Sequence, residues 1–161
     1  MAVALSRCGG GGRSEEPQGP ITARVTHVVD GDTIDVELPE GAEETVRYIG
    51  IDTPETVKPD TPVQCGGPKA HAVNERLVGR RTVTLRFDRE RRDVYDRLLA
   101  YVYVPVEEPG ARPLFVNAEL VRRGLARILT IRPNDSFADL FARLVAKAGA
   151  AGRGLWGRCG V

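Results

Sequence analysis

Residues 30–55 read DGDTIDVELPEGAEETVRYIGIDTPE, and the rest of the chain is organised around this stretch. Within it, Thr33 to Leu38 and Thr45 to Ile51 alternate apolar with polar side chains, as half-buried strands do. Asp32 precedes the first of these strands and Asp52 follows the second. Carboxylates are poor core residues, so their placement at two strand ends indicates a polar site at one edge of a sheet.

The residue types in this stretch suit one hard cation and one phosphate group. Asp32 and Asp52 offer carboxylate oxygens to a cation such as calcium, with waters and a backbone carbonyl completing its ligands. Arg47 can donate two parallel hydrogen bonds to a phosphate, which a lysine cannot do. Glu55 follows a proline that restricts the backbone, so its carboxylate can be held where it orients or deprotonates a water. Together these groups indicate phosphodiester hydrolysis.

Each piece of the stretch also has an ordinary structural interpretation. Asp30-Gly31 lies between apolar runs, where such a pair commonly forms a turn. Residues 52–55, taken alone, are typical of a loop or of the start of a helix. The two pieces together, with Arg47 five residues before Asp52, favour a functional site.

Six segments of the chain follow one another in the order of a known family: Val29–Thr33, Val46–Glu55, Gly67–Ala70, Tyr95–Val102, Asn117–Ala126 and Gly154–Trp156. With them, the chain resembles the staphylococcal-nuclease-like, or thermonuclease, family over residues 20–158. The resemblance implies a β-barrel with added helices, namely a five-stranded OB-fold barrel with about three helices. It also implies a calcium-dependent phosphodiesterase that cleaves DNA and RNA and leaves 3′-phosphate and 5′-hydroxyl ends.

The resemblance places four residues around one calcium ion. Asp32 and Asp52 would bind the ion directly, with the backbone carbonyl of Thr53 as the third protein ligand. Asp30 would hold a metal-bound water. A metal site of this kind leaves the remaining positions around the ion to water and substrate.

The other residues of the expected site would act on the substrate. Glu55 would serve as the general base or position the attacking water. Arg47 and Arg97 would neutralise the pentacoordinate phosphate. Tyr95 would contact the nucleobase, with half-buried packing at a strand end as its alternative role.

The sequence departs from the family's pattern at two places near the substrate. Asp96 replaces a glycine, which adds a negative charge beside Arg97 and removes backbone freedom. Leu129, Thr130 and Ile131 stand where a well-known member has aromatic residues, and base stacking contributes roughly 1–3 kcal/mol per base. We therefore expect weaker nucleotide binding with the phosphate chemistry intact.

Periodicity and turn residues predict the remaining elements. Strands are expected at 21–29, 33–38, 45–51, 81–87 and 98–104, and helices at 68–78, 114–124 and 136–148. The first three strands should form a curled antiparallel meander. Residues 53–67 are predicted to form a loop, because they hold several prolines and glycines. Ser136 is expected near the cap of the last helix, and Trp156 as a core plug beneath that helix.

Composition is that of an ordinary globular domain. The 161 residues are 42% hydrophobic and 28% charged, with a net charge of +1. Residues 30–60 carry ten acids and residues 122–158 carry eight Lys or Arg, which would bring a polyanion to a cation. A solvated basic helix face explains most of those arginines equally well. We expect DNA and RNA as substrates, single strands preferred, and a monomer with no stable protein partner.

Residues 1–20 form a segment of their own before the predicted nuclease domain, residues 21–161. An apolar start, Cys8 and the glycines after it resemble the end of a bacterial lipoprotein signal, although Arg7 stands where a small residue is wanted. Either Cys8 is a lipid anchor and the true start lies upstream, or the segment is a disordered tail. We expect a secreted or surface-anchored protein, with a cytoplasmic location as the alternative.

The cysteines are Cys8, Cys65 and Cys159. Cys65 and Cys159 would fit a disulfide in an oxidising compartment, which leaves Cys8 for lipidation or removal. Three free thiols in a cytosolic protein are the alternative.

Two other functions compete with the nuclease. One is a non-catalytic OB-fold module that binds nucleic acid through a decayed site, and the other is a surface protein that uses the barrel as an interaction scaffold. The presence of Arg47, Glu55 and Arg97 argues against the first, because a protein that only binds nucleic acid needs no general base. An intact metal site would be unexplained in the second.

Overall fold

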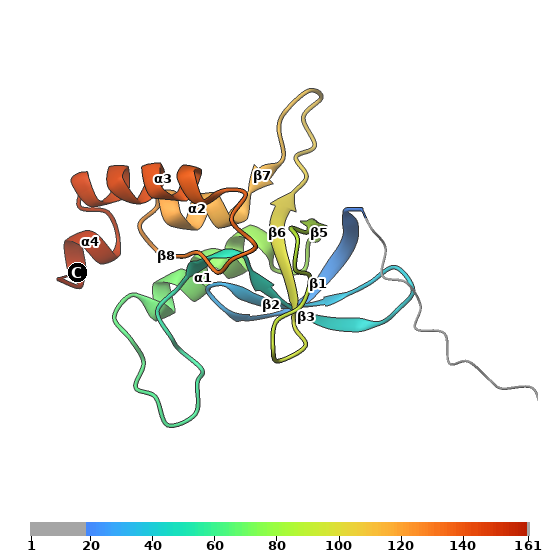
Figure 1. Cartoon of the computed structure of the whole chain (residues 1–161), viewed down its shortest axis with the longest axis horizontal. Helices are drawn as coiled ribbons and strands as arrows, with labels where there is room; N and C mark the ends of the chain where they lie inside the picture. The colour runs from blue at the N-terminus through green and yellow to red at the C-terminus, as the bar shows by residue number, and fades with distance from the viewer. Residues whose placement is uncertain (1–18, 161) are drawn as a thin grey trace, which may run out of the picture.

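The computed structural model describes residues 19–160, and in them five strands close a barrel around which helices pack (Figure 1). The barrel strands are β1 (Ile21–Asp30), β2 (Thr33–Glu37), β3 (Glu43–Tyr48), β5 (Thr82–Arg86) and β6 (Leu98–Val104). β1, β2 and β3 form the predicted antiparallel meander, and β5 pairs with β1 and with β6. A parallel pairing of β3 with β6 closes the barrel. The predicted fold class is confirmed.

The barrel is filled by side chains that alternate along its strands. In β2, Ile34 and Val36 are fully buried while Glu37 faces solvent. In β3, Val46 and Tyr48 point inward in the same way. Burying an aliphatic side chain of this size contributes roughly 1.5–3 kcal/mol, so the alternation fixes the register of each strand.

The chain leaves the barrel at Gly50, where a single strand over residues 45–51 had been expected. That prediction is wrong, because Gly50 takes a φ of 81° and the chain bends there. A side chain at this position would also meet the ring of Phe141, with a Cβ only 2.5 Å from Cε2. After the bend, β4 (Gly50–Asp52) pairs with β8 (Arg127–Leu129) in a small second sheet.

The helices are α1 (Gly67–Val78), α2 (Val116–Arg122), α3 (Ala138–Ala150) and the short α4 (Leu155–Arg158). α1 matches its prediction, whereas α2 starts later than expected because β7 (Leu114–Phe115) pairs with the end of β6. Ser136 does not cap α3, since its hydroxyl donates to Asp88 Oδ1 at 2.9 Å. α1 packs on β1, and α2 packs between β6 and α3.

The core plug near the C-terminus is Leu155 and not Trp156. Leu155 is 1% exposed, whereas Trp156 is only partly buried. Leu155 lies against Gly66, whose lack of a side chain leaves room for it. The prediction of Trp156 is wrong, because adjacent residues of a helix point in different directions and here Leu155 faces the core.

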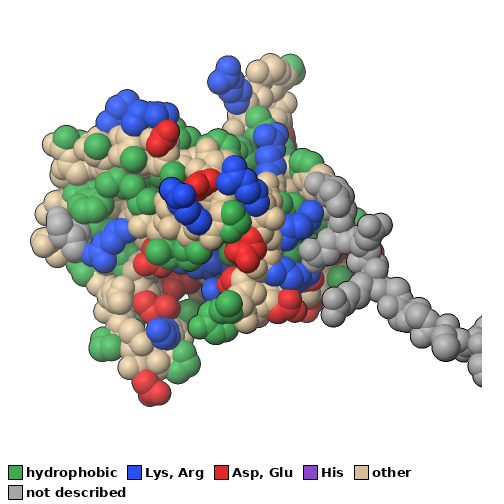
Figure 2. Space-filling model, in the orientation of Figure 1, with side chains coloured by type: hydrophobic (Ala, Val, Ile, Leu, Met, Phe, Trp, Pro, Cys, Tyr) green, Lys and Arg blue, Asp and Glu red, His purple; other side chains and the backbone are tan. Residues whose placement is uncertain are grey.

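Charged side chains of both signs are interspersed on the face shown in Figure 2. Part of the predicted basic flank is neutralised locally, since Arg122 and Arg123 both form ion pairs with Glu119. Within residues 19–160, no helix combines the length and the apolar character that crossing a membrane requires.

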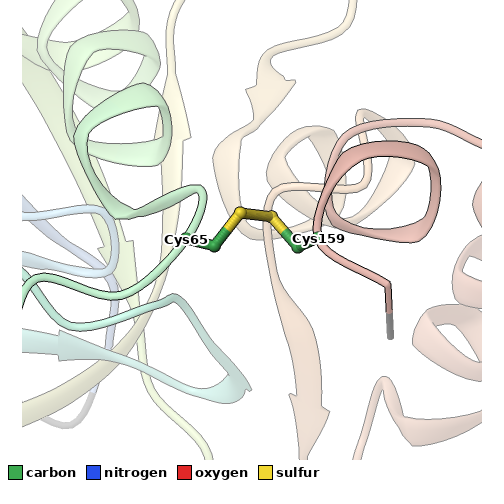
Figure 3. Close-up of a disulfide and its surroundings, with 2 residues drawn as sticks. All are labelled: Cys65 and Cys159. Carbon is green, nitrogen blue, oxygen red and sulfur yellow. A yellow bond between two sulfur atoms is a disulfide. The ribbon is translucent and has the colours of Figure 1, made fainter.

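A disulfide joins Cys65, just before α1, to Cys159, just after α4 (Figure 3). Their Cα atoms are 5.9 Å apart, and 94 residues separate them in the sequence. The predicted pairing is confirmed. Cys8, the predicted lipid anchor, lies outside the described residues.

Candidate active site

Every site residue expected from the sequence lines one groove of about 470 Å³. Its lining includes Asp30, Asp32, Thr53, Arg47, Asp52, Glu55, Tyr95 and Arg97. Strand pairing explains the convergence, because Thr33 of β2 lies opposite Arg47 of β3 and Arg47 lies opposite Leu99 of β6. The residues at the starts of β2 and β6 therefore meet beside Arg47.

Arg47 connects the two carboxylates expected to bind the cation. Its Nη1 lies 2.9 Å from Asp32 Oδ2, and its Nη2 lies 2.9 Å from Asp52 Oδ1. Nη1 also donates to the Ile51 carbonyl at 3.1 Å. The guanidinium is thus fixed at the groove by groups from the β1–β2 turn and from β4.

Asp32 is a buried carboxylate whose ionisation is opposed by its surroundings. Burial raises the pKa of Asp32 above its usual value and Asp52 adds to this, while Arg47 and the Thr53 amide, which donates to Oδ2 at 2.7 Å, act in the opposite direction. A cation at this place would relieve the cost of holding two carboxylates together.

The donor set fits a hard cation with oxygen ligands. Asp32 and Asp52 supply carboxylates, and the buried Thr53 Oγ1 has no hydrogen-bond partner among the described residues. Residues 19–160 contain no cluster of three or more His, Cys, Asp or Glu side chains arranged for a metal. Calcium sites routinely combine a few carboxylates with backbone oxygens and waters, and this groove offers that combination.

Asp30 and Gly31 form a turn that is also part of the groove. Asp30 Oδ1 accepts hydrogen bonds from the Thr56 hydroxyl at 2.7 Å and from the Gly31 amide at 2.8 Å. Burial raises the pKa of Asp30, and the charge of neighbouring Asp32 raises it further. The hydrogen bonds from Thr56 and Gly31 lower it, but the pKa stays above its usual value. A Cβ on Gly31 would lie 2.7 Å from Thr53 Oγ1, so the turn needs glycine to approach β4.

Glu55 is held as an ionised carboxylate at the start of the long loop. Its Oε1 accepts backbone N–H groups from Thr56 at 3.1 Å, Val57 at 3.0 Å and Lys58 at 3.0 Å. Burial raises the pKa of Glu55, but these hydrogen bonds and one with Asp30 outweigh it and bring the pKa below its usual value. A carboxylate held in this way is a weak proton acceptor, which favours orienting a water over removing its proton completely.

Arg97 is held by Asp93. Asp93 Oδ2 accepts from Arg97 Nε at 2.8 Å and lies 2.8 Å from its Nη2. Arg97 Cζ lies 5.4 Å from the ring centroid of Tyr95, which is 77% exposed. The alternative role of Tyr95, half-buried packing, is therefore wrong.

Asp96 keeps the backbone conformation of the glycine that it replaces. Its φ is 65°, in the left-handed region. Its carboxylate lies 3.7 Å from Arg92 Nε, and its carbonyl accepts from Arg92 Nη1 at 2.7 Å. The added charge is therefore placed beside Arg92.

Sequence reasoning missed three groups that hold the site. Thr56 donates to Asp30, Gln64 holds the backbone of Glu55, and Asp93 holds Arg97. For Asp93 the only available signal was its spacing of four residues from Arg97, which indicates an ion pair in helices and not in loops. Thr56 and Gln64 carried no signal.

A second, more apolar pocket of about 300 Å³ adjoins the groove. It shares Arg47, Tyr95 and Arg97 with the groove, and Leu129 and Ile131 also line it. The aliphatic side chains that replace the family's aromatics therefore line the same pocket as Arg97.

Comparison with known proteins gives one family and several close relatives. Residues 45–158 match the family model described as staphylococcal nuclease homologue. The chain is 40% identical over 134 residues to the thermonuclease of Staphylococcus intermedius, covering 83% of this chain and 75% of that protein. It is 37% identical over 135 residues to the thermonuclease of Staphylococcus hyicus, with 84% and 75% covered. It is also 37% identical over 142 residues to endonuclease YncB of Bacillus subtilis, with 87% and 64% covered.

Proposed function

This chain belongs to the staphylococcal nuclease family, and on that premise we propose that it is a calcium-dependent nuclease that cleaves both DNA and RNA. It is a nuclease that hydrolyses phosphodiester bonds, and members of this family depend on a metal. The observation that carries the proposal is the convergence of all the expected groups on one groove.

Asp32, Asp52 and the carbonyl of Thr53 would hold the calcium ion, and Asp30 would hold a water bound to it. The raised pKa of buried Asp32 and the unpartnered Thr53 hydroxyl support a cation at this position. When bound, the ion supplies Lewis-acid stabilisation of charge on a phosphate oxygen.

Glu55, Arg47 and Arg97 would carry out the reaction. Glu55 orients the attacking water, and its depressed pKa keeps it ionised at neutral pH. Arg47 and Arg97 donate hydrogen bonds to the phosphate oxygens as charge develops on them. The bond from phosphorus to the 5′-oxygen breaks, which leaves a 3′-phosphate and a 5′-hydroxyl end.

Tyr95 and the neighbouring apolar pocket would contact the nucleobase. Tyr95 is exposed and close to Arg97, so a base can reach its ring without repacking of the barrel. A single strand presents its bases more freely than a duplex, and we propose single strands as the preferred substrate. Leu129 and Ile131 offer no ring for stacking, so we expect weaker nucleotide binding than aromatic residues there would give.

We propose that residues 21–161 are the nuclease domain of an exported protein that acts as a monomer. The Cys65–Cys159 disulfide supports an oxidising compartment, either as a secreted protein or at the cell surface. A lipid anchor at Cys8 would favour the second.

The test is cleavage of single-stranded DNA with calcium, with a calcium chelator, and by Glu55→Gln. We expect cleavage that requires calcium and falls about 10²–10⁴-fold in the variant, because a positioned carboxylate contributes on that order. End analysis should find 3′-phosphates. Cleavage that continues unchanged with the chelator and in the variant would overturn the mechanism. Tight binding without cleavage would show a non-catalytic binding module.

A further inference from the structure

The loop of residues 53–66 connects β4 to α1 and carries Glu55 near its start. Its end is linked covalently to Cys159, just after α4. The Glu55 N–H donates to Gln64 Oε1 at 3.1 Å, and the Gln64 N–H donates to the Glu55 carbonyl at 3.0 Å. This two-way pair closes the base of the loop, which projects from the body of the molecule (Figure 1). The next residue, Cys65, forms the disulfide to Cys159 (Figure 3).

Two glycines pack the same loop base between Glu55 and α4. A Cβ on Gly67 would lie 2.6 Å from Thr56 Cγ2 and 3.1 Å from the Glu55 carbonyl oxygen. Gly66, with a φ of 88°, lies against Leu155 of α4 on the other side. Residues 64–67 therefore lie between α4 and residues 55–56, and the disulfide links them covalently to the end of α4.

The two carboxylates that would bind the cation are positioned by other elements. Asp32 directly precedes β2, and Asp52 is the last residue of β4, so both lie at the ends of paired strands. The disulfide is also accessible, because Cys65 is exposed and Cys159 is partly exposed. A soluble thiol reductant can reach it, and its reduction would loosen Glu55 more than it loosens Asp32 and Asp52.

We propose that the Cys65–Cys159 disulfide positions Glu55 through Gln64, so that this nuclease reaches full activity only after oxidation. The inference rests on the role proposed above for Glu55. In a thiol-reducing compartment the chain would be a weak nuclease, and formation of the disulfide on export would activate it.

The redox step is an ordinary thiol–disulfide exchange with a dithiol reductant. One thiolate of the dithiol attacks a sulfur of the disulfide and forms a mixed disulfide, which the second thiol then resolves. Two electrons pass to the protein, which gains the Cys65 and Cys159 thiols, and the reductant leaves as a cyclic disulfide. Oxidation by a disulfide oxidant reverses the exchange.

The first measurement compares kcat, KM and calcium Kd of the oxidised protein, the dithiothreitol-reduced protein and Cys65→Ser/Cys159→Ser, all in a Cys8→Ser background. Misplacing a catalytic group by about 1 Å costs up to roughly 10²-fold, so we expect kcat to fall about 10- to 100-fold. KM and calcium Kd should change much less than kcat, because Asp32, Arg47 and Asp52 lie in or beside paired strands. The double serine variant should not respond to dithiothreitol. Thermal unfolding shows that each form is folded at the assay temperature.

Three further measurements separate positioning from a loss of stability. In a Glu55→Gln background, reduction should change the residual rate by less than about twofold, because the positioned carboxylate is already absent. Gln64→Met keeps the disulfide and removes the acceptor, and it should lower kcat without changing calcium Kd. Hydrogen exchange at the amides of residues 56–58, which bond to Glu55 Oε1, should quicken on reduction.

The result that would overturn the inference is a folded, reduced protein whose kcat and whose exchange at residues 56–58 equal those of the oxidised form. An equal effect of reduction in the Glu55→Gln background would also overturn it, since that would show general loosening of the fold. If the oxidised protein fails to cleave with calcium, the proposed function falls, and the exchange at residues 56–58 alone decides whether the disulfide positions Glu55.

Discussion

The two sides of the groove are built in different ways. Arg47 and Asp52 lie in paired strands, Asp32 directly precedes β2, and Arg47 connects the two carboxylates. Glu55 and Arg97 lie outside the barrel strands, and each depends on a dedicated partner, Gln64 for Glu55 and Asp93 for Arg97. The comparison indicates that strand pairing places the carboxylates at the barrel edge, whereas Glu55 and Arg97 are held by single side chains in loops.

The difference has a functional meaning. Changes to Asp32 or Asp52 should remove metal binding and activity together. Changes on the loop side should remove activity and leave metal binding intact. The predictions below test this division.

The largest effect is expected for Asp32→Asn. Loss of the ion removes several kcal/mol of charge stabilisation, so the rate should fall on the order of 10³-fold or more. The fold should persist, because the change removes a buried charge whose pKa burial has raised. Cleavage assays and thermal unfolding without calcium check both points. A variant that cleaves at a tenth of the normal rate or better would contradict the proposed ligand.

Arg97→Lys should have the next largest effect. Lysine keeps the charge but loses the two parallel donors, so kcat should fall about 10²-fold with calcium Kd unchanged. Arg112→Lys, on an exposed loop that does not line the groove, is the matched control and should cleave normally. A weakened calcium Kd in Arg97→Lys would show that the two sides of the groove are not separate.

Asp93→Asn should produce a smaller loss through Arg97. The amide keeps one acceptor but loses the charge that holds the guanidinium at 2.8 Å, so we expect kcat to fall on the order of tenfold. In an Arg97→Lys background the same change should have little further effect, because the two residues act as a unit. Additive losses would show that Asp93 acts on something other than Arg97.

Asp96→Gly should have the smallest effect. Glycine relieves the left-handed φ but adds freedom to the unfolded chain, so the free energy of unfolding should change by less than about 1 kcal/mol. The rate should stay within about threefold, because the Asp96 carboxylate lies beside Arg92. Steady-state kinetics and thermal unfolding measure both. A tenfold gain in kcat would show that Asp96 opposes the Arg97 clamp.

Much of the barrel could be predicted from the sequence, because alternation with a period of two reports directly which face of a strand is buried. The strand over residues 45–51 was predicted as one piece, since its alternation gives no sign of the bend at Gly50. That bend depends on Phe141, a residue distant in the sequence that packs against it.

The candidate site divides in the same way. Asp32, Asp52 and Glu55 stand in short segments whose spacing already indicates a cation and a water. Gln64 and Asp93 act through single contacts that loop geometry creates, so neither composition nor periodicity records them. The disulfide could be proposed from a count of cysteines, but its position beside Gln64 is visible only in the structure.

The most direct test of this division is calcium titration of Glu55→Gln beside Asp32→Asn and the unchanged protein. The account predicts that Glu55→Gln binds one calcium ion with a Kd within about twofold of normal yet cleaves about 10²–10⁴-fold more slowly. Asp32→Asn should lose both binding and cleavage. Loss of calcium binding in Glu55→Gln, or normal binding in Asp32→Asn, would contradict the assignment of metal binding to Asp32 and of catalysis to Glu55.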